Sequence, residues 1–192
     1  MLDKSVPYVG LYMRRKAGTR LSACHPLPDG YSFVFYTDGS ESDWAAIEAS
    51  VLEFDSEFAA LLYFGGKFMQ HQDELRRRCL FIENSGGEKI ATATAWWHNV
   101  NGKRRPWLQW IAVHPMYQGL GLGKALISRA TELMLSLEGD ADIFLHSQTW
   151  SYKAIDIYKS NGFQLTSEKA LYKDGKSNYR KAKKILAKLR RE

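Results

Sequence analysis

Three alternating glycines at residues 119–123 give the clearest chemical signal in the sequence. They lie between an apolar run that ends at Val113 and a segment with helical spacing, so they predict a turn that opens a helix. Glycine lets the backbone approach a ligand closely, and the first N–H groups of a helix, with its dipole, attract phosphate. Lys124 adds a cation. The segment predicts an anion site, and a turn that needs glycine only for its backbone angles is the alternative.

Two well-known phosphate loops do not fit this spacing. A Walker A loop would need Gly at Gln118 and Ser or Thr at Ala125, and a dinucleotide fingerprint would need Gly at Lys124. The sequence therefore favours neither ATP nor NAD as the ligand.

A second chemical segment follows at residues 145–163, where a predicted strand leads into a short helix that stops at Gly162. The helix carries Tyr158, whose phenol keeps its proton at neutral pH and can supply it where negative charge develops. The alternative is a core tyrosine with a hydrogen-bonded hydroxyl. His146 lies on the strand and titrates near neutrality.

Together the two segments resemble the GNAT superfamily of CoA-dependent N-acetyltransferases. Residues 118–123 match its Q/R-x-x-G-x-G/A motif, and Ala154, Tyr158 and Gly162-Phe163 match its A-x-x-x-Y-x-x-x-G-F segment. The resemblance is most specific over residues 107–164, and the order of elements extends it to 31–172. It implies an α/β fold, with a central mixed sheet flanked by helices, and acetyl-CoA as the acyl donor without a metal.

The resemblance also implies roles for individual residues. The backbone of Ile111, Ala112 and Val113 would hold the pantetheine arm. The turn would hold the pyrophosphate through Gln118, Gly119, Leu120, Gly121, Leu122, Gly123 and Lys124. Ala154 and Tyr158 would contact the cofactor, and Tyr158 would lie beside the thioester sulfur as the acid that protonates the leaving thiolate. Ser151 stands where the family often has Asn, and it can either bond the cofactor or cap the helix.

The base for the acceptor amine is harder to find. An alkylammonium with pKa near 10.4 must lose a proton before it attacks, at a cost of about 4.6 kcal/mol at pH 7. Family members often carry a Glu on the strand before the glycine turn, but residues 107–110 include no carboxylate. His146 is the candidate base, and His98 and His114 are alternatives. A water chain to Glu53, Asp55 or Glu57 is a further alternative.

Aromatic residues gather around the predicted site and suggest an enclosed acceptor pocket for a cationic or aromatic amine. They are Trp96, Trp97, Trp107, Trp110, Trp150 and Tyr152. Core packing explains the same residues equally well.

The elements that must position these residues follow from hydrophobic periodicity. We expect strands over 9–14, 31–36, 79–83, 89–98, 107–113, 143–147 and 163–172. We expect helices from Ser42 to Phe54, over 58–64, from the glycine turn to Leu137, and over 151–160. The order contains a strand, crossover helix, strand unit inside a mixed sheet.

The length of 192 residues fits one domain with short extensions. We expect an N-terminal arm or extra strand (1–30), an N-acetyltransferase domain (31–172) and a basic helical tail (173–192). The tail holds nine basic and two acidic residues, so the net charge of +6 comes from a +7 tail on a nearly neutral body. Its apolar spacing predicts a helix that docks on its own domain or on a second subunit, as in a homodimer; a nucleic-acid partner is not expected.

Cys24 and Cys79 are too few for a disulfide framework and lack metal-ligand spacing. We expect a reduced, cytoplasmic compartment, no secretory signal and no membrane span. The leading hypothesis is acetyl transfer from acetyl-CoA to a primary amine of a small molecule or peptide. The alternatives are a non-catalytic acyl-CoA-binding regulatory module, and a protein- or ribosome-associated acetyltransferase that uses the basic tail.

Overall fold

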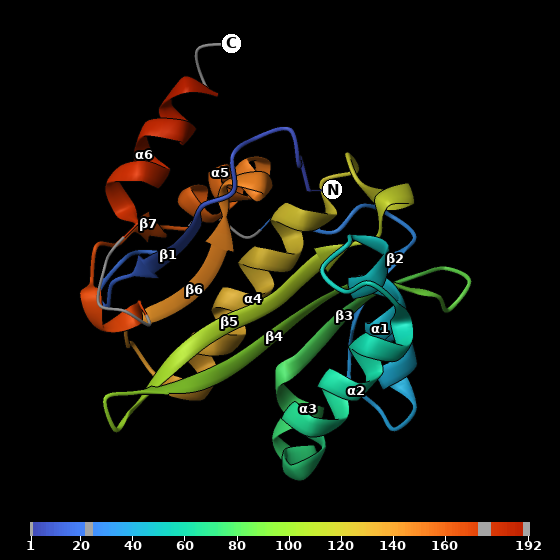
Figure 1. Cartoon of the computed structure of the whole chain (residues 1–192). Helices are drawn as coiled ribbons and strands as arrows, with labels where there is room; N and C mark the ends of the chain where they lie inside the picture. Colours follow the sequence, from blue (N-terminus) through green and yellow to red (C-terminus); the bar gives the residue numbers. More distant parts are fainter. Residues whose placement is uncertain (1, 22–24, 173–177, 190–192) are drawn as a thin grey trace.

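The computed structural model describes residues 2–21, 25–172 and 178–189, and it arranges their helices around one seven-stranded sheet (Figure 1). The spatial order of the strands is β2, β3, β4, β5, β6, β1, β7. Their bounds are Tyr31–Phe35, Cys79–Asn84, Lys89–Val100, Lys103–Val113, Ile143–Gln148, Gly10–Arg15 and Gln164–Leu165, in that order.

One junction of the sheet differs from all the others. Neighbouring strands run antiparallel except β5 and β6, which run parallel and pair through Trp107 and Phe144. On their other sides, β5 pairs with β4 and β6 pairs with β1. Beyond the pair Trp107 and Phe144, β5 and β6 separate toward their carboxyl ends. The resulting gap is the kind of place where open α/β sheets hold ligands.

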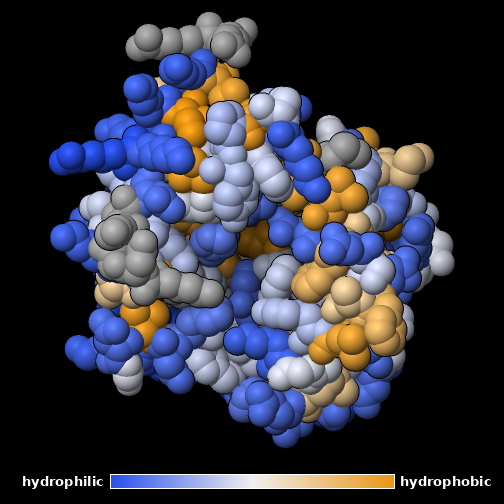
Figure 2. Space-filling view, viewed as in Figure 1, coloured by the Kyte–Doolittle hydropathy of each residue, from blue (hydrophilic) through white to orange (hydrophobic). Residues whose placement is uncertain are grey.

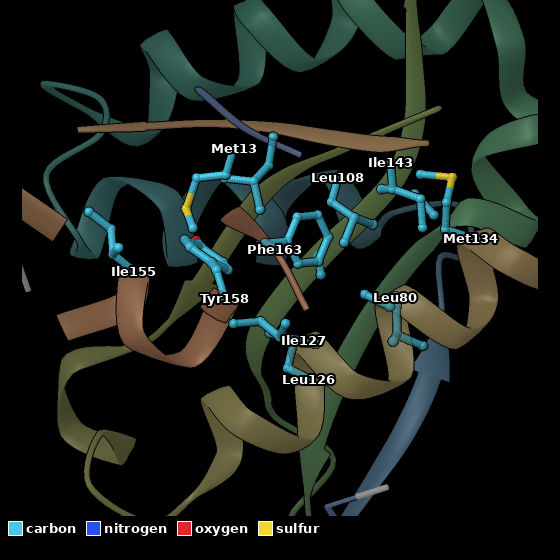
Figure 3. Close-up of a cluster of buried hydrophobic side chains, with 14 of the residues drawn as sticks. Met13, Leu80, Leu108, Leu126, Ile127, Met134, Ile143, Ile155, Tyr158 and Phe163 are labelled. Atoms are coloured by element: carbon cyan, nitrogen blue, oxygen red, sulfur yellow. The ribbon is translucent and has the colours of Figure 1, made fainter. Parts of the chain in front are cut away.

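Helices cover both faces of the sheet. Three helices, α1 (Ser40–Ser50), α2 (Glu57–Phe68) and α3 (Gln72–Arg78), connect β2 to β3 and bury their apolar sides, including Trp44, Phe64 and Leu75, on one face. The other face is covered by α4 (Leu122–Glu138), α5 (Tyr152–Ser160) and α6 (Tyr179–Lys188). Figure 3 shows the core of this second layer, where Leu126, Ile127 and Met134 of α4 meet the sheet.

The N-terminal strand is an integral part of the sheet. β1 pairs antiparallel with β6 over its full length, from Gly10 opposite Gln148 to Arg15 opposite Ile143, and with β7 on its other side. Its alternate residues Leu11 and Met13 are buried.

The expected strand over 163–172 is wrong. Pairing with β1 stops after Leu165, and the chain then turns into a short 3₁₀ segment at Lys169–Leu171 that buries Leu171 and Tyr172 against Trp107 and Phe144. The first helix also begins earlier than Ser42, at Ser40, because Gly39 takes the left-handed conformation that starts it. The sequence analysis did not predict α3.

The basic helix α6 packs on β1 of the same chain and buries Ala182 and Leu186. Its basic residues Arg180, Lys181, Lys183, Lys184 and Lys188 are exposed. The remaining tail residues named for their charge, Lys173, Asp174, Lys176, Arg190, Arg191 and Glu192, lie outside the described residues.

Across the described part of the chain, no helix is both long and apolar enough to cross a bilayer, and no group of three or more His, Cys, Asp or Glu is arranged to hold a metal ion. Cys79 is a buried free thiol, and Cys24 falls outside the described ranges.

Candidate active site

A cavity of about 1380 Å³ occupies the gap between β5 and β6. Its walls come from residues 107–113 of β5, residues 146–148 of β6, the start of α4 and the inner side of α5. Figure 2 shows a hollow with an apolar floor near the middle of this face of the molecule. The cavity is large enough to hold two substrates side by side.

A β-bulge shapes the strand side of the cavity. Thr94 of β4 pairs with Gln109 and Thr92 pairs with Ala112, so Trp110 and Ile111 together oppose one residue of β4. Trp110 has a φ of 54°, which is unusual for a residue with a Cβ. A bulge interrupts the ladder and turns the strand, so backbone groups here are turned away from β4 and can serve a ligand.

The glycine turn lies at the cavity wall and starts α4. Gly119 and Gly121 have φ of 87° and 83°, and a Cβ on either would meet open space, so backbone angle rather than packing requires glycine there. The side-chain amide of Gln118 donates to the carbonyl of Val113 at 2.9 Å and ties the turn to β5. The N–H groups of Leu122 and Gly123, the first two of α4, precede the first intrahelical bonds, whereas the N–H of Lys124 donates to the carbonyl of Gly121 at 3.0 Å. Lys124 itself is exposed.

These observations fit the donor that the sequence implies. A turn kept open by glycine, a helix N-terminus and a cation match the needs of a pyrophosphate, and the bulged strand next to it offers backbone groups to an extended arm.

The structure brings nearly all the predicted site residues to this one cavity. Lining it are Ile111, Ala112, Val113, Gln118, Gly119, Gly121, Leu122, Gly123, Lys124, His146, Ser151, Ala154 and Tyr158. Leu120 does not line it; its side chain is half exposed on the outer side of the turn. Ser151 precedes α5 and makes no capping hydrogen bond with its side chain.

Tyr158 reaches the cavity from α5 while its ring lies in the buried core. It belongs to the same apolar cluster as Met13, Ile127 and Ile155 (Figure 3). Burial raises the pKa of its phenol above the usual value of 10.0, and the carboxyls of Glu53 and Glu48 raise that pKa further. The phenol therefore keeps its proton at neutral pH and can act as a proton donor.

His146 lies on β6 and opens onto the cavity, with its ring 4.8 Å from that of Tyr12. A Cβ on Gly10 would come within 3.2 Å of its Nε2, so glycine at position 10 leaves room for the imidazole. Although the cavity exposes the side chain, the surrounding protein desolvates it and lowers its pKa below 6.5. His146 is therefore neutral at pH 7 and has a lone pair to accept a proton.

The two histidines predicted as alternative bases, His98 and His114, have structural partners. His98 Nε2 lies 3.0 Å from Oε1 of Gln109. The pKa of His98 is lowered mainly by burial and further by the positive charge of Lys67. His114 Nδ1 accepts from the backbone N–H of Met116 at 3.3 Å and stabilises the short turn before the glycines.

Of the three carboxylates predicted as alternative bases, only one lies at the cavity. Glu53 lines the cavity and accepts from the amide of Gln148 at 3.0 Å, whereas Asp55 and Glu57 do not line it. Glu48 of α1 was not among the predicted residues, although it also lines the cavity and is only 1% exposed. A signal was available, since Glu48 lies four residues after Trp44 and next to Ile47 on the apolar side of that helix.

Aromatic rings form much of the remaining wall. Of the predicted set, Trp107, Trp110, Trp150 and Tyr152 line the cavity, joined by Tyr12, Tyr63 and Tyr172, which were not predicted. Trp96 and Trp97 are not part of its lining; they stack on each other with centroids 4.3 Å apart.

Comparison with known proteins gives a family match over most of the chain. The family model described as "Acetyltransferase (GNAT) family" matches residues 42–163, which include the glycine turn and Tyr158. No curated protein matches the chain.

Solved structures share the fold at low sequence identity. A GCN5-related N-acetyltransferase from Sphaerobacter thermophilus aligns with a TM-score of 0.64 at 17% identity, covering 84% of this chain and 49% of that one. A GNAT-family acetyltransferase from Colwellia psychrerythraea aligns with a TM-score of 0.62 at 12% identity, covering 83% and 54%. A GCN5-related N-acetyltransferase from Kribbella flavida aligns with a TM-score of 0.52 at 17% identity, covering 82% of this chain and 56% of that one. The chain thus spans about half the length of these proteins.

Proposed function

The chain belongs to the GNAT acetyltransferase family, and on that premise we propose that it transfers the acetyl group of acetyl-CoA to a primary amine of a small molecule or peptide, by direct attack in a ternary complex. One observation carries the proposal: a single cavity joins the glycine turn, the bulged strand β5 and the phenol of Tyr158. The donor and the acceptor can therefore meet beside a proton donor.

The residues of this chain divide the work of binding. The N–H groups at the start of α4, with Lys124, would hold the pyrophosphate, and the backbone of residues 111–113 would hold the pantetheine arm. Ser151 and Ala154 would border the arm from the side of α5. Acetyl-CoA, when bound, supplies an activated acetyl thioester.

Tyr158 would supply the proton that the reaction consumes. As the nitrogen–carbon bond forms and the carbon–sulfur bond breaks, the phenol gives its proton to the sulfur, and a proton from the nitrogen restores the phenol. General acid catalysis of this kind contributes about 10²- to 10⁴-fold in rate. His146, neutral and facing the cavity, is a base that the sequence analysis proposed for deprotonating the ammonium group.

A non-catalytic acyl-CoA-binding module is the second candidate function. It is favoured by the lack of a carboxylate at residues 107–110 of β5, where family members often carry a Glu that can act as the base. Gln109 of this stretch is already bonded to His98.

The test that separates the two is thiol release from acetyl-CoA with a panel of primary amines. Acceptor-dependent release of CoA thiol supports the acetyltransferase. Saturable binding of acetyl-CoA without any such release would reject it and support the module.

A further inference from the structure

Glu48 is an anomaly within the core. Its carboxyl is buried in the last turn of α1, and Oε1 has no hydrogen-bond partner. A buried ionised carboxylate without a partner costs several kcal/mol. A residue of this kind is expected to be protonated, or to meet a cation that enters the site.

The surroundings of Glu48 are acidic and phenolic. Burial raises the pKa of its carboxyl well above 4.5, and the charge of Glu53 raises it further. Glu48 in turn raises the pKa of Tyr63 on α2, Cys79 on β3 and Tyr158 on α5. Glu48, Glu53 and Tyr158 all line the same cavity.

The cavity is also unevenly charged. Its basic side chains Lys124 and Lys153 lie on α4 and α5, and Lys169 lies in the turn after β7. Residues 40–56, which form α1 and the loop behind it, include no Lys, Arg or His. The carboxyl groups that α1 and the loop behind it bring to the cavity are those of Glu48 and Glu53.

A second, independent observation points to a ligand at this wall. Gln109 lines the cavity from β5, and its Nε2 is buried without a hydrogen-bond partner, although its Oε1 bonds His98. Buried polar atoms are normally paired. Glu48 Oε1 on α1 and Gln109 Nε2 on β5 are therefore an acceptor and a donor that are both buried and both unpaired, on residues that line the same cavity.

We propose that Glu48 and Glu53 form the recognition site for the primary ammonium group of an acceptor that carries no carboxylate, and that Glu48, in place of His146, is the base that takes its proton. The proposal rests on the proposed acetyltransferase function. Trp110 and Tyr63, whose ring centroids lie 4.8 Å apart, give this part of the cavity flat apolar walls, which suit an aromatic body and the cation next to it.

The proton balance of the reaction is complete with these groups. The ammonium gives one proton to the carboxylate of Glu48, and the free nitrogen then attacks the acetyl carbon. Tyr158 protonates the departing sulfur and recovers a proton from the nitrogen of the new amide. Glu48 releases its proton through Glu53, which is exposed at the cavity wall.

Three matched acceptors test the recognition site: 2-phenylethylamine, phenylalaninamide and phenylalanine. The last two differ in an uncharged amide against a carboxylate; because the amide also lowers the pKa of the α-amine, their rates are compared per unit of free amine. We expect kcat/KM for phenylalanine to be at least about tenfold lower than for phenylalaninamide, because like charges repel next to Glu48 and Glu53. The variant Glu53→Gln should reduce that difference. Equal rates for the two compounds would overturn the recognition site.

The variant Glu48→Gln tests the base. We expect kcat/KM to fall about 10²-fold or more at pH 7 and then to rise about tenfold per pH unit up to the pKa of the amine, because only free amine can react. Glu57→Gln, on an exposed residue outside the cavity, is the control. A lower curve of unchanged shape would overturn the role as base. If no amine releases thiol with the unaltered protein, the acetyltransferase function itself fails, and that outcome is distinct from either result.

Discussion

Trp107 of β5 and Phe144 of β6 lie opposite each other at the one point where, in the described residues, these two parallel strands pair, and their rings stack with centroids 5.7 Å apart. Both side chains are buried. The strands separate on the carboxyl side of this pair, so the stacking stands at the point where the gap begins; Trp107 lines the cavity, and Phe144 packs behind it.

Shortening Phe144 tests how much this contact stabilises the fold. Phe144→Ala should lower the free energy of unfolding by about 3–5 kcal/mol, since the change removes a buried ring and leaves a void where the sheet is weakest. Urea unfolding measures the change. Phe58→Ala is the matched control, because Phe58 is 69% exposed and should cost less than about 0.5 kcal/mol. Similar losses for the two variants would mean that the splayed junction does not depend on this stacking.

The glycine turn should respond differently at its two glycines. Gly121→Ala forces a Cβ into a left-handed conformation with φ of 83°, at a cost of about 1–2 kcal/mol. The strain falls on the turn that would hold the pyrophosphate, so we expect acetyl-CoA affinity to drop about tenfold by calorimetry.

Gly123→Ala is its control. Gly123 does not have a positive φ, and a Cβ there would touch Ile157 at an ordinary 3.7 Å. We expect little change in affinity for this variant. A turn whose affinity is equally sensitive at both positions would contradict the conformational argument.

Removing the phenol of Tyr158 tests the proton donor. Tyr158→Phe keeps the buried ring and should lower turnover about 10²-fold with little change in acetyl-CoA affinity. Tyr36→Phe is a matched control, because Tyr36 is also buried and hydrogen-bonded, to Glu41 at 2.8 Å, but does not line the cavity. If thiol release by Tyr158→Phe stays at the level of the unaltered protein, the phenol is not the acid.

Local signals in the sequence predicted the parts of the site that depend on local geometry. The glycines predicted a helix start, and the spacing of Ala154 and Tyr158 placed the phenol on a short helix. The place of β1 between β6 and β7 was not predictable in this way, because Gly10 pairs with Gln148 across more than a hundred residues. Strand pairing of this range depends on the whole sheet.

The β-bulge at Trp110 and the buried carboxyl of Glu48 were not predicted from the sequence, for different reasons. Nothing in the composition near Trp110 marks a bulge, since the residue that takes the positive φ there is a tryptophan rather than a glycine. Glu48 could have been found, because an acidic side chain next to Ile47 on the apolar side of a helix needs a partner or a function. The bases predicted from the sequence were instead histidines and the exposed acids after the helix.

The buried carboxyl of Glu48 should also make stability depend on pH. Its pKa is raised in the folded state, so between about 4.5, the pKa expected in the unfolded chain, and the higher folded pKa, the folded protein binds more protons than the unfolded one. Stability therefore falls as pH rises through this window, by up to about 1.4 kcal/mol per pH unit. Glu48→Gln removes the titrating group while it keeps the shape of the side chain. We expect the variant to gain stability over the unaltered protein as pH rises from 4.5, measured by urea unfolding at a series of pH values.

The same series for Glu57→Gln should follow the unaltered protein, because Glu57 is exposed. Parallel curves for Glu48→Gln and the unaltered protein would show that Glu48 is ionised and stabilised by a partner inside the fold, which would remove the reason for an ammonium group to bind there.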